Sequence, residues 1–158
     1  MDVKYINPFI LATKTVFKAM LNIEMTMDKP LLKHDKSTSG DVTGVMGVAG
    51  DGDKRGMMCI SFSRKGALYA YKTLMGDERS DMDPEVVDAI GELTNIISGQ
   101  SRKELEIAGV NLTASIPTVV VGKNVELHFM CKLPIISLPF KYSTDYGPEM
   151  LYVNFSFE

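Results

Sequence analysis

The sequence predicts an α+β fold in which long helices pack on one face of a mainly antiparallel sheet. Three observations support this: the order of elements is helix, strands, helix, long helix, strands; short strand patterns cluster in two groups; and one stretch has an unusually clear amphipathic helical pattern. The chain has 158 residues, of which 45% are hydrophobic, so material for a core is ample. We therefore expect one domain spanning residues 1–158.

Composition excludes several classes of partner. The net charge is -3 and no basic patch stands out, which argues against nucleic acid. No apolar run approaches the roughly 18 residues of a spanning helix, and the N-terminus does not resemble a signal peptide. Cys59 and Cys131 lie far apart, without the spacing of a disulfide framework or a zinc site. We expect a cytoplasmic protein with reduced thiols and no membrane partner.

The first part of the chain reads as a helix, a short strand, a hairpin and a second helix. Asn7 is the expected N-cap of the first helix and Pro8 its first residue. Ser63 caps the second helix and Gly76 ends it. The predicted elements are a helix over 7–21, a strand over 23–27, a loop or edge segment over 29–40, hairpin strands over 42–49 and 56–62, and a helix over 64–75.

The clearest element is a long helix from Pro84 to Ala108. Asp83 is a good N-cap, Pro84 suits the first helical position, and Gly109 follows as a stop. Its buried stripe follows the i, i+4, i+7, i+11 spacing: Val86, Ile90, Leu93 and Ile97. The rest of the fold is expected to be arranged around this helix.

The remaining third of the chain is rich in β-forming residues. A run over 110–121 is broken by Pro117, and a strand is predicted over 125–131. The segment 133–141 contains Pro134 and Pro139, which favours an edge strand or a bulge. Apolar and polar residues alternate over 151–157, so we expect a half-buried final strand.

Candidate functional residues lie on the polar side of the long helix. Asp88, Glu92, Asn95 and Gly99 follow one another at intervals of about one turn, opposite the buried stripe. Gly91 and Ser98 lie beside that stripe. Small residues in this position indicate that another surface approaches closely, and a docking partner is one candidate. A Glu-x-x-Asn pattern alone is very common, and taken by itself it favours a solvated helix face over a functional site.

The sequence offers no metal site of recognisable spacing. His34 and His128 have no metal-spaced partner. Asp51-Gly52-Asp53 begins like a calcium loop, but the glutamate expected at the twelfth position is Phe62. We therefore expect no metal or other cofactor bound by this chain.

At these residues the sequence resembles the CheC/CheX/FliY family of bacterial chemotaxis phosphatases. The family motif is Asp or Ser, three residues, Glu, two residues, Asn, then twenty-one residues and Pro. Asp88, Glu92, Asn95 and Pro117 match it at every position. The opening Tyr5-Ile6-Asn7-Pro8-Phe9 and the total length also look like CheX. CheC-like members often carry a second Glu-x-x-Asn on the first helix, and here that helix has no glutamate, which points to the CheX branch.

The resemblance implies hydrolysis of the phospho-aspartate of a CheY-type response regulator. Glu92 would pair with a lysine of the regulator, and Asn95 would enter its active site and orient the attacking water. Magnesium would be held by the regulator. Asp88 would add a polar contact or support the helix surface, and Pro117 would shape the strand or turn packed against the helix. The resemblance also implies a homodimer joined through sheet edges, with the strand over 151–157 as a candidate contributor.

A second hypothesis assigns the same fold to a protein that has no catalytic activity. In that case the chain is a non-catalytic adaptor of the chemotaxis or flagellar switch apparatus. An adaptor has no chemical need for the Glu92 and Asn95 pair, so stimulated phosphate release from a phosphorylated regulator distinguishes the two hypotheses.

Overall fold

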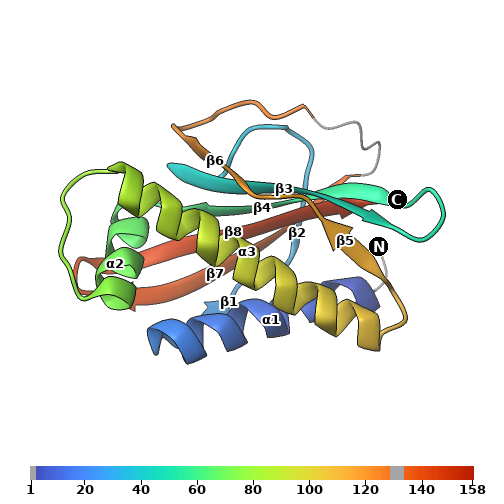
Figure 1. Cartoon of the computed structure of the whole chain (residues 1–158), viewed down its shortest axis with the longest axis horizontal. Coiled ribbons are helices and arrows are strands. Elements are labelled where there is room, and N and C mark those ends of the chain that lie inside the picture. Colours follow the sequence, from blue (N-terminus) through green and yellow to red (C-terminus); the bar gives the residue numbers. More distant parts are fainter. Residues whose placement is uncertain (1–2, 129–133) are drawn as a thin grey trace.

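The computed structural model describes residues 3–128 and 134–158, which form three helices and eight strands (Figure 1). The helices are α1 (Val3–Leu21), α2 (Arg64–Met75) and α3 (Pro84–Ile107). The strands are β1 (Thr26–Met27), β2 (Leu31–Lys33), β3 (Val42–Gly50), β4 (Arg55–Phe62), β5 (Leu112–Ala114), β6 (Thr118–Val121), β7 (Ile135–Thr144) and β8 (Gly147–Phe157).

The strands form one sheet in the order β1-β7-β8-β4-β3-β5, with β2 also on β7 and β6 also on β3. Each of these pairings is antiparallel. Figure 1 shows α1 and α3 on one face of the sheet and α2 at one end. The predicted α+β class, with helices packed on one face of an antiparallel sheet, is confirmed.

Aromatic stacking attaches α1 to the middle of the sheet. The rings of Phe9 and Phe155 are stacked with centroids 3.9 Å apart, and Phe17 stacks on Phe62 at 6.3 Å. The same core includes the buried stripe of α3, so both long helices share one apolar layer with the sheet.

The predicted start of α1 is wrong. The helix begins at Val3, so Asn7 lies inside it and is not its N-cap. Pro8 lies in the second turn, where its fixed φ is compatible with a helix and its missing N–H removes one hydrogen bond near the helix start. Packing extends the helix to earlier residues, because the Tyr5 ring contacts Phe157 edge-on at 5.3 Å.

Two other strand predictions change in the structure. Only Thr26–Met27 of the predicted 23–27 strand pairs with a neighbour. The predicted strand over 125–131 is replaced, over residues 125–128, by irregular chain with one bridge between Glu126 and Ser37. Residues 129–131 lie outside the described residues. The segment 29–40 does contain an edge strand, β2.

The second hairpin, β7–β8, was missed. Of the segment predicted over 133–141 as an edge or bulge, residue 133 lies outside the described residues and residues 135–141 belong to the long strand β7, which pairs with β8 on one side and with β1 and β2 on the other. Pro139 lies opposite the break between β1 and β2, where a missing N–H costs no ladder bond to either short strand. Gly147, with φ 106°, provides the turn into β8.

The final strand is buried on both faces. Asn154 and Ser156, expected to face solvent, are 4% and 1% exposed. The segment before β3 contacts Asn154, whose amide donates a hydrogen bond to Ser39 at 3.1 Å. Because β8 pairs with β4 and β7, it is an interior strand, so the prediction that it supplies a dimer edge is wrong.

Candidate functional site

The start of α3 is fixed by a cap and an ion-pair cluster. The Asp83 carboxylate accepts hydrogen bonds from the backbone N–H groups of Glu85 and Val86, both at 3.0 Å. Arg79 donates to Asp83 at 2.8 Å and to Glu85 at 3.0 Å. The N–H of Val86 and the neighbouring guanidinium of Arg79 hold the pKa of Asp83 below its usual range. The predicted cap and helix start are confirmed.

The buried face of α3 determines how closely the helix packs on the sheet. Val86, Ile90, Leu93 and Ile97 are each at most 1% exposed, as the periodicity predicts. Thr94 is fully buried beside them and lies over Gly44 of β3. A Cβ at Gly44 would be 1.9 Å from the Thr94 Oγ1, so only glycine permits this approach. Asn95 is the next residue, and its position therefore depends on this contact.

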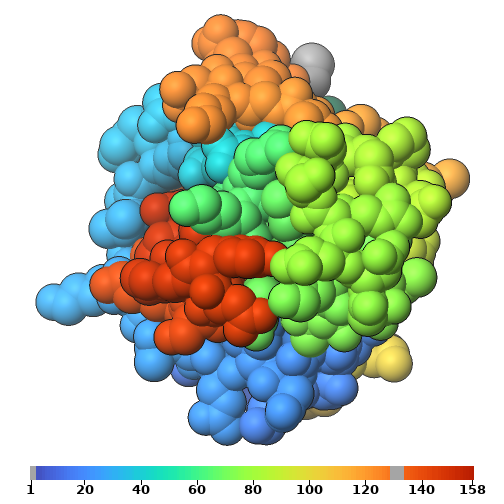
Figure 2. Space-filling model, turned by 90° about the vertical axis from the view of Figure 1, so that its left-hand side faces the viewer, coloured from blue at the N-terminus to red at the C-terminus, as the bar shows by residue number. Residues whose placement is uncertain are grey.

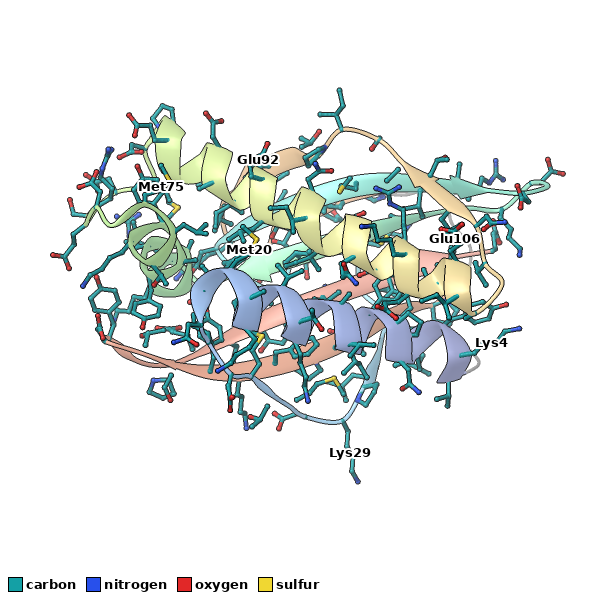
Figure 3. All side chains as sticks on the ribbon, turned by 60° about the horizontal axis from the view of Figure 1, so that its bottom comes forward. Lys4, Met20, Lys29, Met75, Glu92 and Glu106 are labelled. Atoms are coloured by element: carbon teal, nitrogen blue, oxygen red, sulfur yellow. The ribbon has the colours of Figure 1, made fainter. Side chains whose placement is uncertain are left out.

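The polar row of α3 faces solvent. Asp88, Glu92 and Asn95 are exposed and Gly99 is partly exposed. Figure 3 shows Glu92 projecting from α3 at the surface of the molecule. Within residues 3–128 and 134–158, the side chains of Glu92 and Asn95 have no hydrogen-bond or ion-pair partner. An unpaired carboxylate and an unpaired amide, one helical turn apart, are therefore free to contact another molecule.

The loop between β5 and β6 forms the wall opposite this row. The groove between helix and loop has a volume of about 690 Å³. Its lining comes from Val87, Asp88, Gly91, Glu92 and Asn95 on α3, and from residues 114–117 and Val119 on the other side. Figure 2 shows the first turns of α3 next to the orange segment that contains β6. The structure thus brings Pro117 to the groove that also holds Glu92 and Asn95.

Gly91 and Ser98 are buried by the chain itself, and burial leaves Ser98 no surface on which a partner could dock. A Cβ at Gly91 would be 3.4 Å from the Val119 side chain, which makes β6 the surface that approaches this glycine. Ser98 is fully buried and its Oγ has no hydrogen-bond partner. Gly91 still contributes to the groove floor, whereas Ser98 lies outside the lining.

Gly99 is partly exposed on α3. A Cβ at this position would be 4.0 Å from a guanidinium nitrogen of Arg102, which is an ordinary contact. Gly99 does not belong to the groove lining. Glu92, Asn95, Asp88, Gly91 and Pro117 line the groove, and Ser98 and Gly99 do not.

Sequence reasoning missed the apolar side of the groove. Ile116 is 88% exposed and Val119 is partly buried, and both line the groove with Pro117. The available signal was the isoleucine immediately before the motif proline, in a segment otherwise predicted as strand. Its relation to α3 depends on the pairing of β6 with β3, which periodicity does not indicate.

The described residues offer neither a metal-binding cluster nor a membrane-spanning helix. Among residues 3–128 and 134–158, no group of three or more histidine, cysteine, aspartate or glutamate side chains could hold a metal ion. None of the helices in this part of the chain has the length and apolar character needed to cross a membrane. Burial raises the pKa of the Cys59 thiol to about 12, so this free cysteine stays protonated and is a poor nucleophile.

Comparison with known proteins assigns the family. Residues 42–141, which include Asp88, Glu92, Asn95 and Pro117, match the family described as Chemotaxis phosphatase CheX. The CheY-P phosphatase CheX of Thermotoga maritima is 30% identical over 139 residues, covering 85% of this chain and 88% of that protein. The chain belongs to the CheX family. The resemblance drawn from the motif is therefore confirmed at the level of the family.

CheX proteins of known structure share the whole fold. The crystal structure of CheX from Desulfovibrio desulfuricans is 32% identical, has a TM-score of 0.85, and covers 98% of this chain and 99% of its own. A CheX-CheY-BeF3-Mg2+ complex from Borrelia burgdorferi is 27% identical with a TM-score of 0.75, covering 98% and 97%. CheX in that complex thus has the architecture described above.

Proposed function

We propose that this protein is a chemotaxis phosphatase that hydrolyses the phospho-aspartate of a CheY-type response regulator. The observation that carries the proposal is the groove in which Glu92 and Asn95 are exposed and unpaired, beside Pro117. Family membership and the name of the Thermotoga maritima relative support the same activity. The CheX-CheY complex of Borrelia burgdorferi supports the class of partner.

In the proposed mechanism Asn95 positions water. Its amide can donate one hydrogen bond and accept another, so it can hold a water molecule in line with the phosphorus. Being neutral, it does not repel the phosphoryl group as a carboxylate would. The water oxygen bonds to phosphorus, the bond from phosphorus to the aspartate oxygen breaks, and inorganic phosphate and a free carboxylate result. Positioning dominates phosphoryl transfer, and a hundredfold acceleration requires only about 2.7 kcal/mol.

Glu92 supplies the complementary charge in this proposal. It lies one turn before Asn95 on the exposed face of α3 and has no cation within hydrogen-bond distance among the described residues. A lysine of the regulator, beside the phosphate, would satisfy it and fix the orientation of the two proteins. Asp88, a further turn away, extends the acidic surface that meets the regulator.

Magnesium is assigned to the regulator in this proposal. The groove contributes two carboxylates, Asp88 and Glu92, and the second is assigned to the regulator's lysine. A hard cation such as Mg²⁺ takes near-octahedral oxygen ligands, including carboxylates and phosphate oxygens. Those ligands would come from the phosphorylated site of the partner.

The direct test is the decay of a phosphorylated CheY-type regulator from the same organism, with and without this protein. The proposal predicts faster phosphate release that increases with the concentration of added protein. Unchanged decay together with measurable binding to the regulator would contradict the proposal and identify a binding adaptor.

We also propose that the protein forms a homodimer through an outer edge of its sheet. The strands at the edges are β1 and β2 on one side and β5 and β6 on the other. Leu31 and Leu32 of β2, 56% and 57% exposed, are the apolar candidates at one of these edges.

Light scattering on the purified protein should give the mass of a dimer, and Leu31→Lys should shift the measured mass toward that of the monomer. A monomeric mass at micromolar concentration for the unchanged protein would contradict the proposal.

A further inference from the structure

Ile116 is a large apolar side chain that the fold leaves in solvent next to the polar row. It is 88% exposed and lines the same groove as Glu92 and Asn95. Single exposed apolar residues are common on protein surfaces, so exposure alone indicates nothing. Here, however, the residue belongs to the loop wall of the groove whose helix wall carries the two groups to which the chemistry is assigned.

The loop that carries Ile116 is fixed on both sides. Ser115 donates its backbone N–H to the Gly47 carbonyl at 2.9 Å, and its Oγ accepts from the Gly47 N–H at 2.9 Å. Pro117 follows with a restricted φ, and Thr118 then pairs with Val45 at the start of β6. These contacts fix the backbone on both sides of Ile116, and its side chain is left in solvent.

The groove is thus divided into two kinds of surface. The exposed side of α3 offers Asp88, Glu92 and Asn95, whereas the loop side offers Ile116 with Pro117 and Val119. Polar groups fix the direction of a bound molecule, and a rigid apolar residue contributes affinity because little conformational entropy is lost on binding. A partner that fills this groove would contact both walls.

We propose that Ile116 is an apolar anchor that binds the phosphorylated regulator in the groove. In this proposal it packs against an apolar patch beside the regulator's phospho-aspartate, while Glu92 engages the lysine. Ile116 contributes affinity and is not a catalytic residue, since it contacts neither the water nor the phosphoryl group. The inference rests on the proposed function and specifies what, besides charge, recognises the partner.

The chain provides a matched control. Ile107, the last residue of α3, is 83% exposed and does not line the groove. Replacing it with serine removes the same side chain from a similarly exposed site. Neither substitution opens a cavity, so both variants should keep the thermal midpoint of the unchanged protein.

The test compares Ile116→Ser, Ile116→Leu and Ile107→Ser for binding to the regulator loaded with beryllofluoride and magnesium, and for catalysed phosphate release. Ile116→Ser should raise Kd and KM at least tenfold and leave kcat within about twofold. Ile116→Leu and Ile107→Ser should stay within about twofold of the unchanged protein. A Kd for Ile116→Ser equal to that of Ile107→Ser would overturn the inference.

The outcomes separate this inference from the proposed function. If the unchanged protein binds the regulator but does not accelerate its dephosphorylation, the phosphatase proposal fails. The role of Ile116 in binding is then tested by the Kd values alone. If the unchanged protein accelerates dephosphorylation and Ile116→Ser does so with the same KM, the phosphatase proposal stands and the role of Ile116 is wrong. Absence of any binding to the regulator overturns both.

Discussion

At the scale of single residues, the proposed function gives Glu92 and Asn95 different roles, charge pairing and water positioning. Glu92 and Asn95 are one turn apart on an exposed helix face, and neither has a partner within the described chain. Leaving both unpaired has no stability benefit for the monomer, because water solvates them equally well when the protein unfolds. In the proposed function both groups contact the phosphorylated regulator.

Reversing the charge at Glu92 should weaken the complex with the regulator. Glu92→Lys places a cation opposite the proposed lysine, so we expect Kd to rise at least tenfold, which corresponds to about 1.4 kcal/mol. The loss should be larger at low salt because screening is weaker there. Isothermal titration at two salt concentrations measures it, with Glu106→Lys at the exposed end of α3 as the control. Equal affinities for the two variants would indicate that Glu92 is only solvated.

Ser98 should be dispensable for function and mildly unfavourable for stability. Its Oγ is buried without a hydrogen-bond partner, which costs free energy relative to an apolar group of similar size. Ser98→Ala should therefore raise the free energy of unfolding by about 1 kcal/mol, since alanine also has the higher helix propensity. Urea denaturation tests this. A decrease of similar size would show that the hydroxyl has a partner in solution.

At the scale of elements, the close packing of α3 on β3 depends on one glycine, Gly44. A Cβ at Gly44 would overlap the Thr94 side chain, whereas a Cβ at Gly47 of the same strand would meet the Ser115 Oγ at an ordinary 3.6 Å. Because Asn95 follows Thr94, any outward shift of the helix also moves the amide relative to the opposite wall of the groove.

Gly44→Ala should therefore affect both stability and activity. Overpacking of this kind costs about 1–3 kcal/mol, and we expect a loss of that size in urea denaturation together with a lower kcat. Gly47→Ala is the matched control and should change neither quantity appreciably. Adding Thr94→Ala to Gly44→Ala should recover part of the stability. Full activity and stability in Gly44→Ala would contradict the role given to this contact.

The N-cap of α3 should make stability depend on acid pH. The pKa of Asp83 is lowered in the folded state, so the folded state favours the carboxylate. This contribution is complete above the unfolded pKa of about 3.9 and is lost as pH falls through the lower folded pKa. Thermal unfolding of the unchanged protein and of Asp83→Asn from pH 7 to pH 2 should show an advantage for aspartate that vanishes at the acid end. A constant difference between the two would contradict the shift.

At the scale of the whole molecule, local sequence patterns were sufficient to predict the helix that carries the site. The arrangement of the strands depends on long-range pairing, which local patterns do not indicate. The stripe from Val86 to Ile97 and the Asp83 cap lie within a few turns, so their pattern was sufficient to place α3. The hairpin of β7 and β8 was missed because its turn at residues 145–146 has no strong two-residue signature. The burial of Asn154 depends on a segment more than a hundred residues earlier, and period-two alternation cannot indicate it.

The candidate site divides in the same way. The row of Asp88, Glu92 and Asn95 could be predicted because it lies on one helix, and Pro117 was found only through the family motif. Ile116, Val119 and the true neighbours of Gly91 and Ser98 could not be predicted, since they follow from the pairing of β6 with β3. The helix side of the groove could therefore be predicted from the local sequence, whereas the loop side is determined by tertiary structure.

The measurement that tests the central claim most directly separates binding from turnover in Asn95→Ala. The variant should bind the beryllofluoride-loaded regulator within a fewfold of the unchanged protein and lose the stimulated phosphate release, a decrease of about a hundredfold or more. Asn111→Ala, which changes an exposed asparagine outside the groove, should retain full activity. Phosphate release by Asn95→Ala at the rate of the unchanged protein would contradict the account.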